Sequence, residues 1–228
     1  MKQLILRNLK LRKVSLIIYA ALIIVSPFYH LFLNKHTVFG GIIYSILSVF
    51  VMFISLFDCG NAFRLQFKLG GNKAYYFNHS LPFSAQEQLN AHYLTTVLMS
   101  VAGAIVLTDY YNVPMGGEIN GVEMTTPMYF IAINLIGHAI AFPKYSEVRR
   151  DFIPYWGFVV VVNFIVPVIF SMSLLLIAIT THSFKLIDNV LDYSINIFGI
   201  VFIIFGIILF GLTYFKQLKK INEAEQTY

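Results

Sequence analysis

Residues 75–93 read YYFNHSLPFSAQEQLNAHY and form a polar stretch, studded with aromatic residues, between two long hydrophobic runs. Ser84 and Glu87 stand three residues apart, just before the sequence becomes apolar at Leu94. This S-x-x-E spacing is that of a capping box, in which each side chain accepts a hydrogen bond from the backbone N–H of the other residue. We therefore expect a helix to begin at Ala85.

Pro82 shapes the chain just before that helix. Proline fixes its own φ angle and steers the residue before it away from helical geometry. Residues 81–83, here called the elbow, should therefore hold the side chains of Leu81 and Phe83 rigidly outside the helix. At the edge of a membrane such an elbow is suited to docking on a partner protein, and the alternative is an ordinary turn packed against its own chain.

The composition places this chain in a membrane. Of its 228 residues 58% are hydrophobic and only 12% are charged, and the mean hydropathy is +0.73. A soluble globular domain carries about 25% charged residues, so that class is excluded. The single cysteine, Cys59, excludes an intrachain disulfide and a metal site built from cysteines.

Six hydrophobic runs reach or approach the roughly 20 residues that a helix needs to cross a bilayer. They predict an all-α membrane protein in which residues 1–228 form a single transmembrane domain. The predicted spans are residues 14–32, 38–57, 93–107, 127–142, 156–179 and 193–215. The third run is short, and the capped start at Ala85 extends it.

Two segments flank these spans. Residues 1–13 are basic and place Leu4, Ile5 and Leu9 near one helical face, which predicts an interfacial amphipathic helix. The alternative for this segment is a basic flank that only sets the orientation of the first span. Residues 216–228 are expected to form a cytoplasmic tail.

The distribution of basic residues predicts the orientation of the chain. Fourteen of the 16 Lys and Arg residues lie in the amino-terminal segment, in the loops after the second and fourth spans, and in the tail. Short loops rich in Lys and Arg stay on the cytoplasmic side, so both termini and Cys59 should be cytoplasmic. The same asymmetry accounts for the net charge of +5, which leaves little support for nucleic-acid binding.

The predicted spans contain almost no ionisable residues, although membrane enzymes and ion-coupled carriers place such residues there. Every Asp, Glu, Lys and Arg lies outside them, and only His138 lies well inside one. A lone histidine among apolar residues is more often a helix-packing residue than a proton relay. The chain has no Walker sequence for ATP, no H-E-x-x-H and no G-x-S-x-G. We therefore expect no catalytic residues, no metal and no cofactor.

Two features inside the spans predict helix geometry. Pro167 lies in the middle of the fifth span with Asn163 four residues before it, which predicts a kink that is either static or a hinge opening a path. Gly199 and Gly206 are seven residues apart and share one face of the last span. Small residues allow helices to approach closely, so we expect tight packing there, within the chain or across a dimer.

Six spans, a basic lead helix, the interfacial sequence S-L-P-F-S-A-Q-E and the lack of an ATP site together resemble the permease subunit of a type-2 ABC exporter. In bacterial members of that family this region typically reads Leu-Pro-Val-Ser followed by a basic residue. Leu81, Pro82 and Ser84 match, whereas Phe83 replaces the small aliphatic residue and Ala85 replaces the base. Residues 1–13 are most similar to the permeases of staphylococcal exporters of phenol-soluble modulins.

This resemblance implies a multi-pass protein of the bacterial cytoplasmic membrane. Its partners would be an ABC-type ATPase subunit, a second permease copy or a related permease in a dimer, membrane lipid, and amphipathic antimicrobial or cytolytic peptides as cargo. The residues that would couple to the ATPase are Leu81, Pro82, Phe83, Ser84 and Glu87. Two alternatives stay open: a non-transporting scaffold or bacteriocin-immunity protein, and an intramembrane enzyme or ion-coupled carrier.

Overall fold

The computed structural model describes residues 1–32, 38–59, 77, 80–110, 126–141, 165, 172, 176, 179–180 and 184–226. Within these ranges the long elements are all helices: α1 (Lys2–Leu11), α2 (Lys13–Phe32), α3 (Val38–Cys59), α6 (Ala85–Tyr110), α7 (Pro127–Ala141) and α10 (Phe184–Gln226). The predicted all-α class is confirmed for this part of the chain. Most of the fifth predicted span, including Asn163 and Pro167, lies outside the described residues.

The observed helices follow three of the predicted runs closely, and a fourth run lies within a longer helix. α2, α3 and α7 differ from the runs 14–32, 38–57 and 127–142 by two residues or fewer at each end. α6 begins at Ala85, where the capping box predicts its start, and continues to Tyr110. The short third run therefore becomes a 26-residue helix by extending into polar residues at both ends.

α10 is longer than the run that predicts it. Its 43 residues cover the predicted span 193–215, nine residues before it and most of the expected tail. The sequence after Phe215 is rich in Lys, Gln and Glu, which favour helix, and Lys219 Nζ lies 3.7 Å from Glu223 Oε1 one turn later. These local preferences explain why the helix does not end where the apolar run ends.

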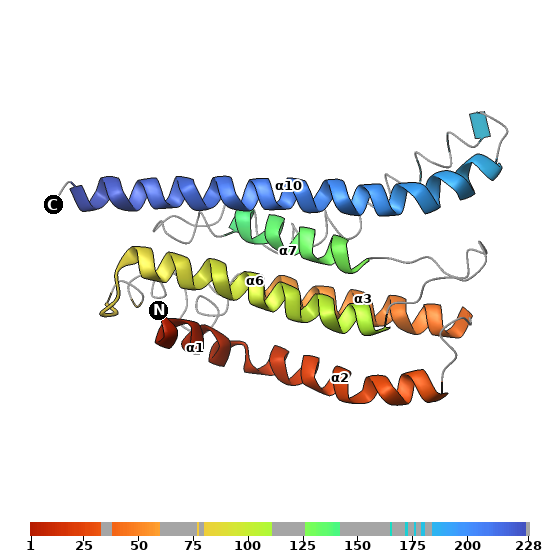
Figure 1. The fold of residues 1–228 in the computed structure, drawn as a ribbon, viewed down its shortest axis with the longest axis horizontal. Coiled ribbons are helices and arrows are strands. Elements are labelled where there is room, and N and C mark those ends of the chain that lie inside the picture. The colour runs from red at the N-terminus through yellow and green to blue at the C-terminus, as the bar shows by residue number, and fades with distance from the viewer. Residues whose placement is uncertain are drawn as a thin grey trace.

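The helices lie side by side with nearly parallel axes (Figure 1). The amino terminus, the carboxyl terminus and the first residues of α6 all lie at one end of the bundle, here called the elbow end (Figure 1). α2 and α6 run away from this end, whereas α3, α7 and α10 run toward it (Figure 1). The elbow therefore lies at the same end of the bundle as the start of α1 and the end of α10 (Figure 1).

α6 is the central helix of the described bundle, because it contacts each of the other five. Among the described residues, three helical segments are long and apolar enough to cross a membrane: Lys13–Leu31, Ala85–Tyr110 and Ile200–Glu223. Within the most apolar 18-residue stretch of each segment, 22%, 61% and 11% of the residues are buried inside the protein. The outer faces of α2 and α10 instead expose large apolar side chains such as Ile24, Phe28, Ile208 and Leu212. Such faces suit contact with lipid.

Two glycines allow the inner helices to approach closely. A Cβ on Gly103 of α6 would lie 2.6 Å from Cζ of Phe130 on α7, which is fully buried. A Cβ on Gly206 of α10 would lie 3.1 Å from the backbone oxygen of Ala132 on α7. Close packing at Gly206 is thus a contact within the chain, and the surroundings of Gly199 lie outside the described side chains.

Candidate functional site

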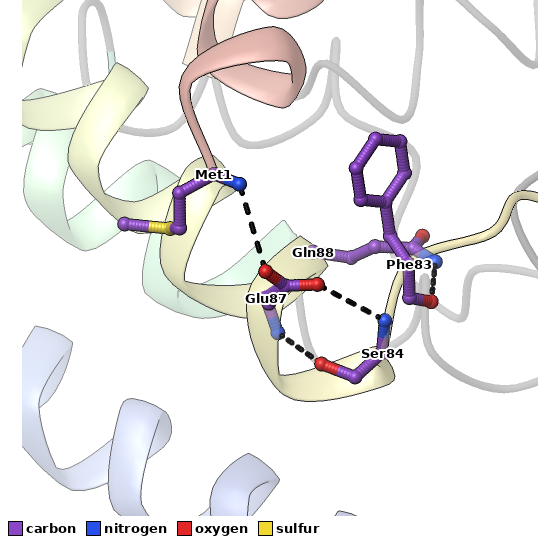
Figure 2. A network of polar contacts seen from close by, with 5 residues as sticks. All are labelled: Met1, Phe83, Ser84, Glu87 and Gln88. Carbon is purple, nitrogen blue, oxygen red and sulfur yellow. Dashed lines mark hydrogen bonds and ion pairs between the residues drawn. The ribbon is translucent and has the colours of Figure 1, made fainter.

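The predicted capping box is present at the start of α6. The backbone N–H of Glu87 donates to Ser84 Oγ at 3.1 Å, and the backbone N–H of Ser84 donates to Glu87 Oε2 at 3.3 Å (Figure 2). The backbone N–H of Gln88 donates to the Ser84 carbonyl at 3.1 Å and begins the helical ladder. A cap of this kind is worth about 1 kcal/mol, so it fixes the point at which the elbow joins the helix.

The elbow is held from both sides of Phe83. The backbone N–H of Phe83 donates to the carbonyl oxygen of Leu81 at 2.8 Å, which closes a tight turn around Pro82. Gln88 Nε2 donates to the carbonyl oxygen of Phe83 at 3.2 Å. Pro82 is exposed, Leu81 and Phe83 are partly buried, and the ring of Phe83 points away from the capping box (Figure 2). The elbow therefore presents apolar surface on a fixed backbone.

α1 packs along the first turns of α6. Leu4 and Asn8 are buried, and Asn8 Nδ2 donates to Thr95 Oγ1 at 3.4 Å. The Met1 amino group lies 3.6 Å from Glu87 Oε1, so the carboxylate that caps α6 also contacts the start of α1 (Figure 2). Both groups of this ion pair are nearly half exposed, so its contribution to stability is small. The inner face of the predicted interfacial helix is thus covered by protein.

A second polar group, which sequence reasoning missed, lies deeper in the bundle. Arg12, His92 and His138, here called the buried basic cluster, are 1%, 3% and 1% exposed. They come from the junction of α1 with α2, from α6 and from α7. The elements that carry them are neighbours, since α6 packs against α1, α2 and α7.

The backbone at Arg12 explains how a residue of the basic lead segment becomes buried. Arg12 is the single residue between α1 and α2, with φ −102° and ψ 16°, and its N–H donates to the Leu9 carbonyl at 3.0 Å. Its neighbour Lys13 is exposed. A signal was present in the sequence, because the buried positions recur at helical spacing: Leu4, Asn8, Arg12, Ser15 and Tyr19. A count of bases by loop ignores that periodicity.

His138 lies in an aromatic contact between three helices. Its ring centroid is 4.5 Å from that of Tyr93 on α6 and 5.2 Å from that of Phe210 on α10. The Tyr93 hydroxyl donates to Thr213 Oγ1 at 3.2 Å, and the Tyr214 hydroxyl donates to Asn90 Oδ1 at 2.8 Å. These contacts agree with the interpretation of His138 as a helix-packing residue.

A family model described as "ABC-2 family transporter protein" matches residues 3–222 of the chain. The chain belongs to the ABC-2 transporter family. It is therefore the membrane component of an ABC transporter, a class that works with an ABC ATPase and is not itself catalytic. No curated protein and no solved structure matched the chain. The similarity to exporters of phenol-soluble modulins stays a prediction.

Proposed function

We propose that this ABC-2 permease is the membrane-spanning subunit of an exporter in the bacterial cytoplasmic membrane, and that its elbow end faces the cytosol. Both termini lie at that end with the elbow (Figure 1). Exposed lysines are concentrated in the segments that form this end, as positive charge on the cytoplasmic side requires: Lys2, Lys10, Lys13, Lys216, Lys219 and Lys220.

The ATPase docks on the elbow in this proposal. The observation that carries it is the fixed backbone of Phe83, whose N–H and carbonyl are both hydrogen bonded while its ring is directed away from the capping box. Leu81 and Pro82 supply further apolar surface, and Ser84 and Glu87 join the elbow to α6. Because α6 contacts every other described helix, a push on the elbow reaches the whole bundle.

In this proposal the cargo is an amphipathic antimicrobial or cytolytic peptide. Two permease subunits pair, and the cargo crosses the membrane along a path between them. The interior of the bundle supports such a cargo because it combines apolar side chains, such as Phe130 and Ile133, with buried hydroxyls, such as Ser48 and Ser100. Asn163 and Pro167 are the hinge in this proposal. Lipid contacts the apolar outer faces of α2 and α10.

The substitution Phe83→Asp tests the docking role. A carboxylate pushed into an apolar cleft on the ATPase is left unpaired, which costs on the order of several kcal/mol and removes most of the binding. We expect ATPase copurification and transport to fall at least tenfold, because a loss of about 1.4 kcal/mol of binding free energy lowers the affinity about tenfold. Membrane insertion should be normal. Ser84→Ala should do less, because losing the cap costs about 1 kcal/mol and keeps the apolar contact.

Gln86→Asp is the matched control, because it adds the same charge at an exposed position in the first turn of α6. An acidic residue is favourable there, so this variant should couple like the parent. If Phe83→Asp inserts normally and couples as well as Gln86→Asp, the elbow is not the docking element. Transport that survives ATP depletion would instead favour an ion-coupled carrier.

A further inference from the structure

Polar contacts join α2 to α6 at the end of the bundle opposite the elbow end, here called the far end. Both helices run away from the elbow end and pack against each other, so their last turns meet at the far end (Figure 1). There His30 Nε2 lies 3.4 Å from Asp109 Oδ1. An ionised carboxylate can only accept a hydrogen bond, so the imidazole is the donor. The pair ties the last turn of α2 to the last turn of α6.

Two buried tyrosines stand next to this pair in the chain. The ring centroids of Tyr29 and Tyr110 are 5.0 Å apart. Both rings belong to the same packed cluster as Leu107, a fully buried residue one turn before Tyr110 on α6. The last turn of α2 therefore packs over the far end of the core.

α2 has a point of bending just before this turn. Pro27 lies inside the helix and has no N–H with which to donate to the carbonyl oxygen of Ile23. Ser26 Oγ donates to that oxygen instead, at 3.1 Å. One turn from the proline, the carbonyl oxygen of Leu22 accepts a hydrogen bond from the Tyr110 hydroxyl at 2.6 Å. Tyr110 thus contacts α2 on both sides of the position at which a helix bends most readily.

The strength of the ion pair suits a contact that forms and breaks. Its two side chains are 28% and 38% exposed. Ion pairs that water reaches shift an equilibrium by about fivefold at most. On the outer face of the same part of α2, Ile24 and Leu31 are exposed and suit contact with lipid, which does not fix a helix in one position.

We propose that the last turn of α2, residues 27–32, is a latch on the extracellular side of the permease. The latch closes the far end of the bundle while His30 is bonded to Asp109, and it bends away from α6 at Pro27 to open that end during transport. The two positions are in equilibrium, so a change that weakens or strengthens the pair shifts the balance between them. The proposal rests on the proposed function, since a cytosolic elbow end makes the far end extracellular.

Labelling of a cysteine behind the latch tests closure in the full chain, in intact cells. Leu107→Cys in a Cys59→Ser background places the single thiol at a fully buried position one turn from Tyr110. A membrane-impermeant maleimide added outside should label it slowly. Asp109→Asn removes the charge and keeps the shape, so it should speed labelling about threefold to fivefold. The exchanged pair, His30→Asp with Asp109→His, should restore the slow rate.

Thr108→Val is the matched control, because it removes a polar group of similar volume from the exposed neighbour of Asp109. The Thr108 hydroxyl donates to the carbonyl oxygen of Ala104 in its own helix at 2.8 Å. This variant should be labelled as slowly as the parent.

His30→Arg tests the latch in the opposite direction. A guanidinium is always charged and offers several donors to one carboxylate, so it should hold Asp109 more tightly than the imidazole does. Transport should fall about threefold while ATPase copurification is unchanged.

Three results would overturn the proposal: labelling of Asp109→Asn as slow as the parent's, an exchanged pair labelled as fast as Asp109→Asn, or transport by His30→Arg equal to the parent's. A lower unfolding midpoint in Asp109→Asn without faster labelling would make the pair purely structural. Failure of the proposed function gives a different result. If inverted vesicles, and not intact cells, show the same dependence of labelling on Asp109, the latch stands and the proposed orientation is wrong.

Discussion

α6 and α10 are both long and apolar enough to cross a bilayer, but they are packed in opposite ways. Within the most apolar 18-residue stretch of each helix, 61% of the residues are buried in α6 and 11% in α10, although this stretch of α10 is the more hydrophobic. Inside a membrane hydrophobicity does not drive helices together, so small and hydroxyl-bearing side chains decide which helix is central. The inner face of α6 carries Thr95, Thr96, Ser100 and Gly103.

The largest loss of stability is expected from a substitution that adds volume at the centre of α6. In Gly103→Val the new side chain collides with Phe130, which is fully buried, and with the Tyr19 hydroxyl, 3.2 Å from the new Cβ. Overpacking of this kind costs typically 1–3 kcal/mol. We expect a clear fall in the unfolding midpoint of the purified protein in detergent.

The double substitution Gly103→Val with Phe130→Ala provides the control for that experiment. Removing the ring makes room for the valine, so the two changes together should cost less than the sum of the two single costs. Additive costs would contradict a direct contact between the two positions. A Gly103→Val variant as stable as the parent would also contradict a direct contact between Gly103 and Phe130.

Substitution of two glycines on α10 should change the unfolding midpoint less than Gly103→Val does. A Cβ on Gly206 meets the backbone oxygen of Ala132 at 3.1 Å, whereas one on Gly211 meets nothing within 4 Å. Replacing glycine by alanine at either position stabilises the helix by up to about 1 kcal/mol through helix propensity. In Gly206→Ala the crowding against Ala132 offsets this stabilisation, whereas in Gly211→Ala nothing does. Gly211→Ala should therefore unfold at a higher temperature than Gly206→Ala, and equal midpoints would remove Gly206 from the α7 contact.

The smallest effect is expected from the hydrogen bond that joins the two helices near the elbow end. Tyr214→Phe removes the bond from the Tyr214 hydroxyl to Asn90 Oδ1, and such bonds between membrane helices are worth about 0.6 kcal/mol on average. The adjacent Phe215 is 66% exposed, so Phe215→Leu serves as the control that should leave the midpoint unchanged. A larger loss in Phe215→Leu than in Tyr214→Phe would show that α10 has a partner on its outer face.

Features set by local chemistry could be predicted from the sequence. The spacing of Ser84 and Glu87 predicts the start of α6, because a capping box needs only a few neighbouring residues. The apolar runs predict α2, α3 and α7 within two residues at each end. Both signals act within one helix, so the rest of the fold does not alter them.

Features set by packing could not be predicted in the same way. A count of bases by loop places Arg12 among those that orient the chain, whereas its burial depends on how α1 lies against α6. The sequence does not mark His92 as buried, because its neighbours in the chain are typical of the polar start of a helix. The extended ends of α10 follow from helix propensity beyond the apolar run, which a search for spans does not consider.

The length of α10 has a mechanical consequence. At 1.5 Å per residue its 43 residues extend over about 65 Å, roughly twice the hydrocarbon thickness of a bilayer. From Phe210, where the helix touches His138, to Gln226 is about 24 Å of continuous helix. A tilt of about 10° about that contact would carry the carboxyl end of α10 about 4 Å sideways, so a small rearrangement among buried rings would be amplified at the elbow end.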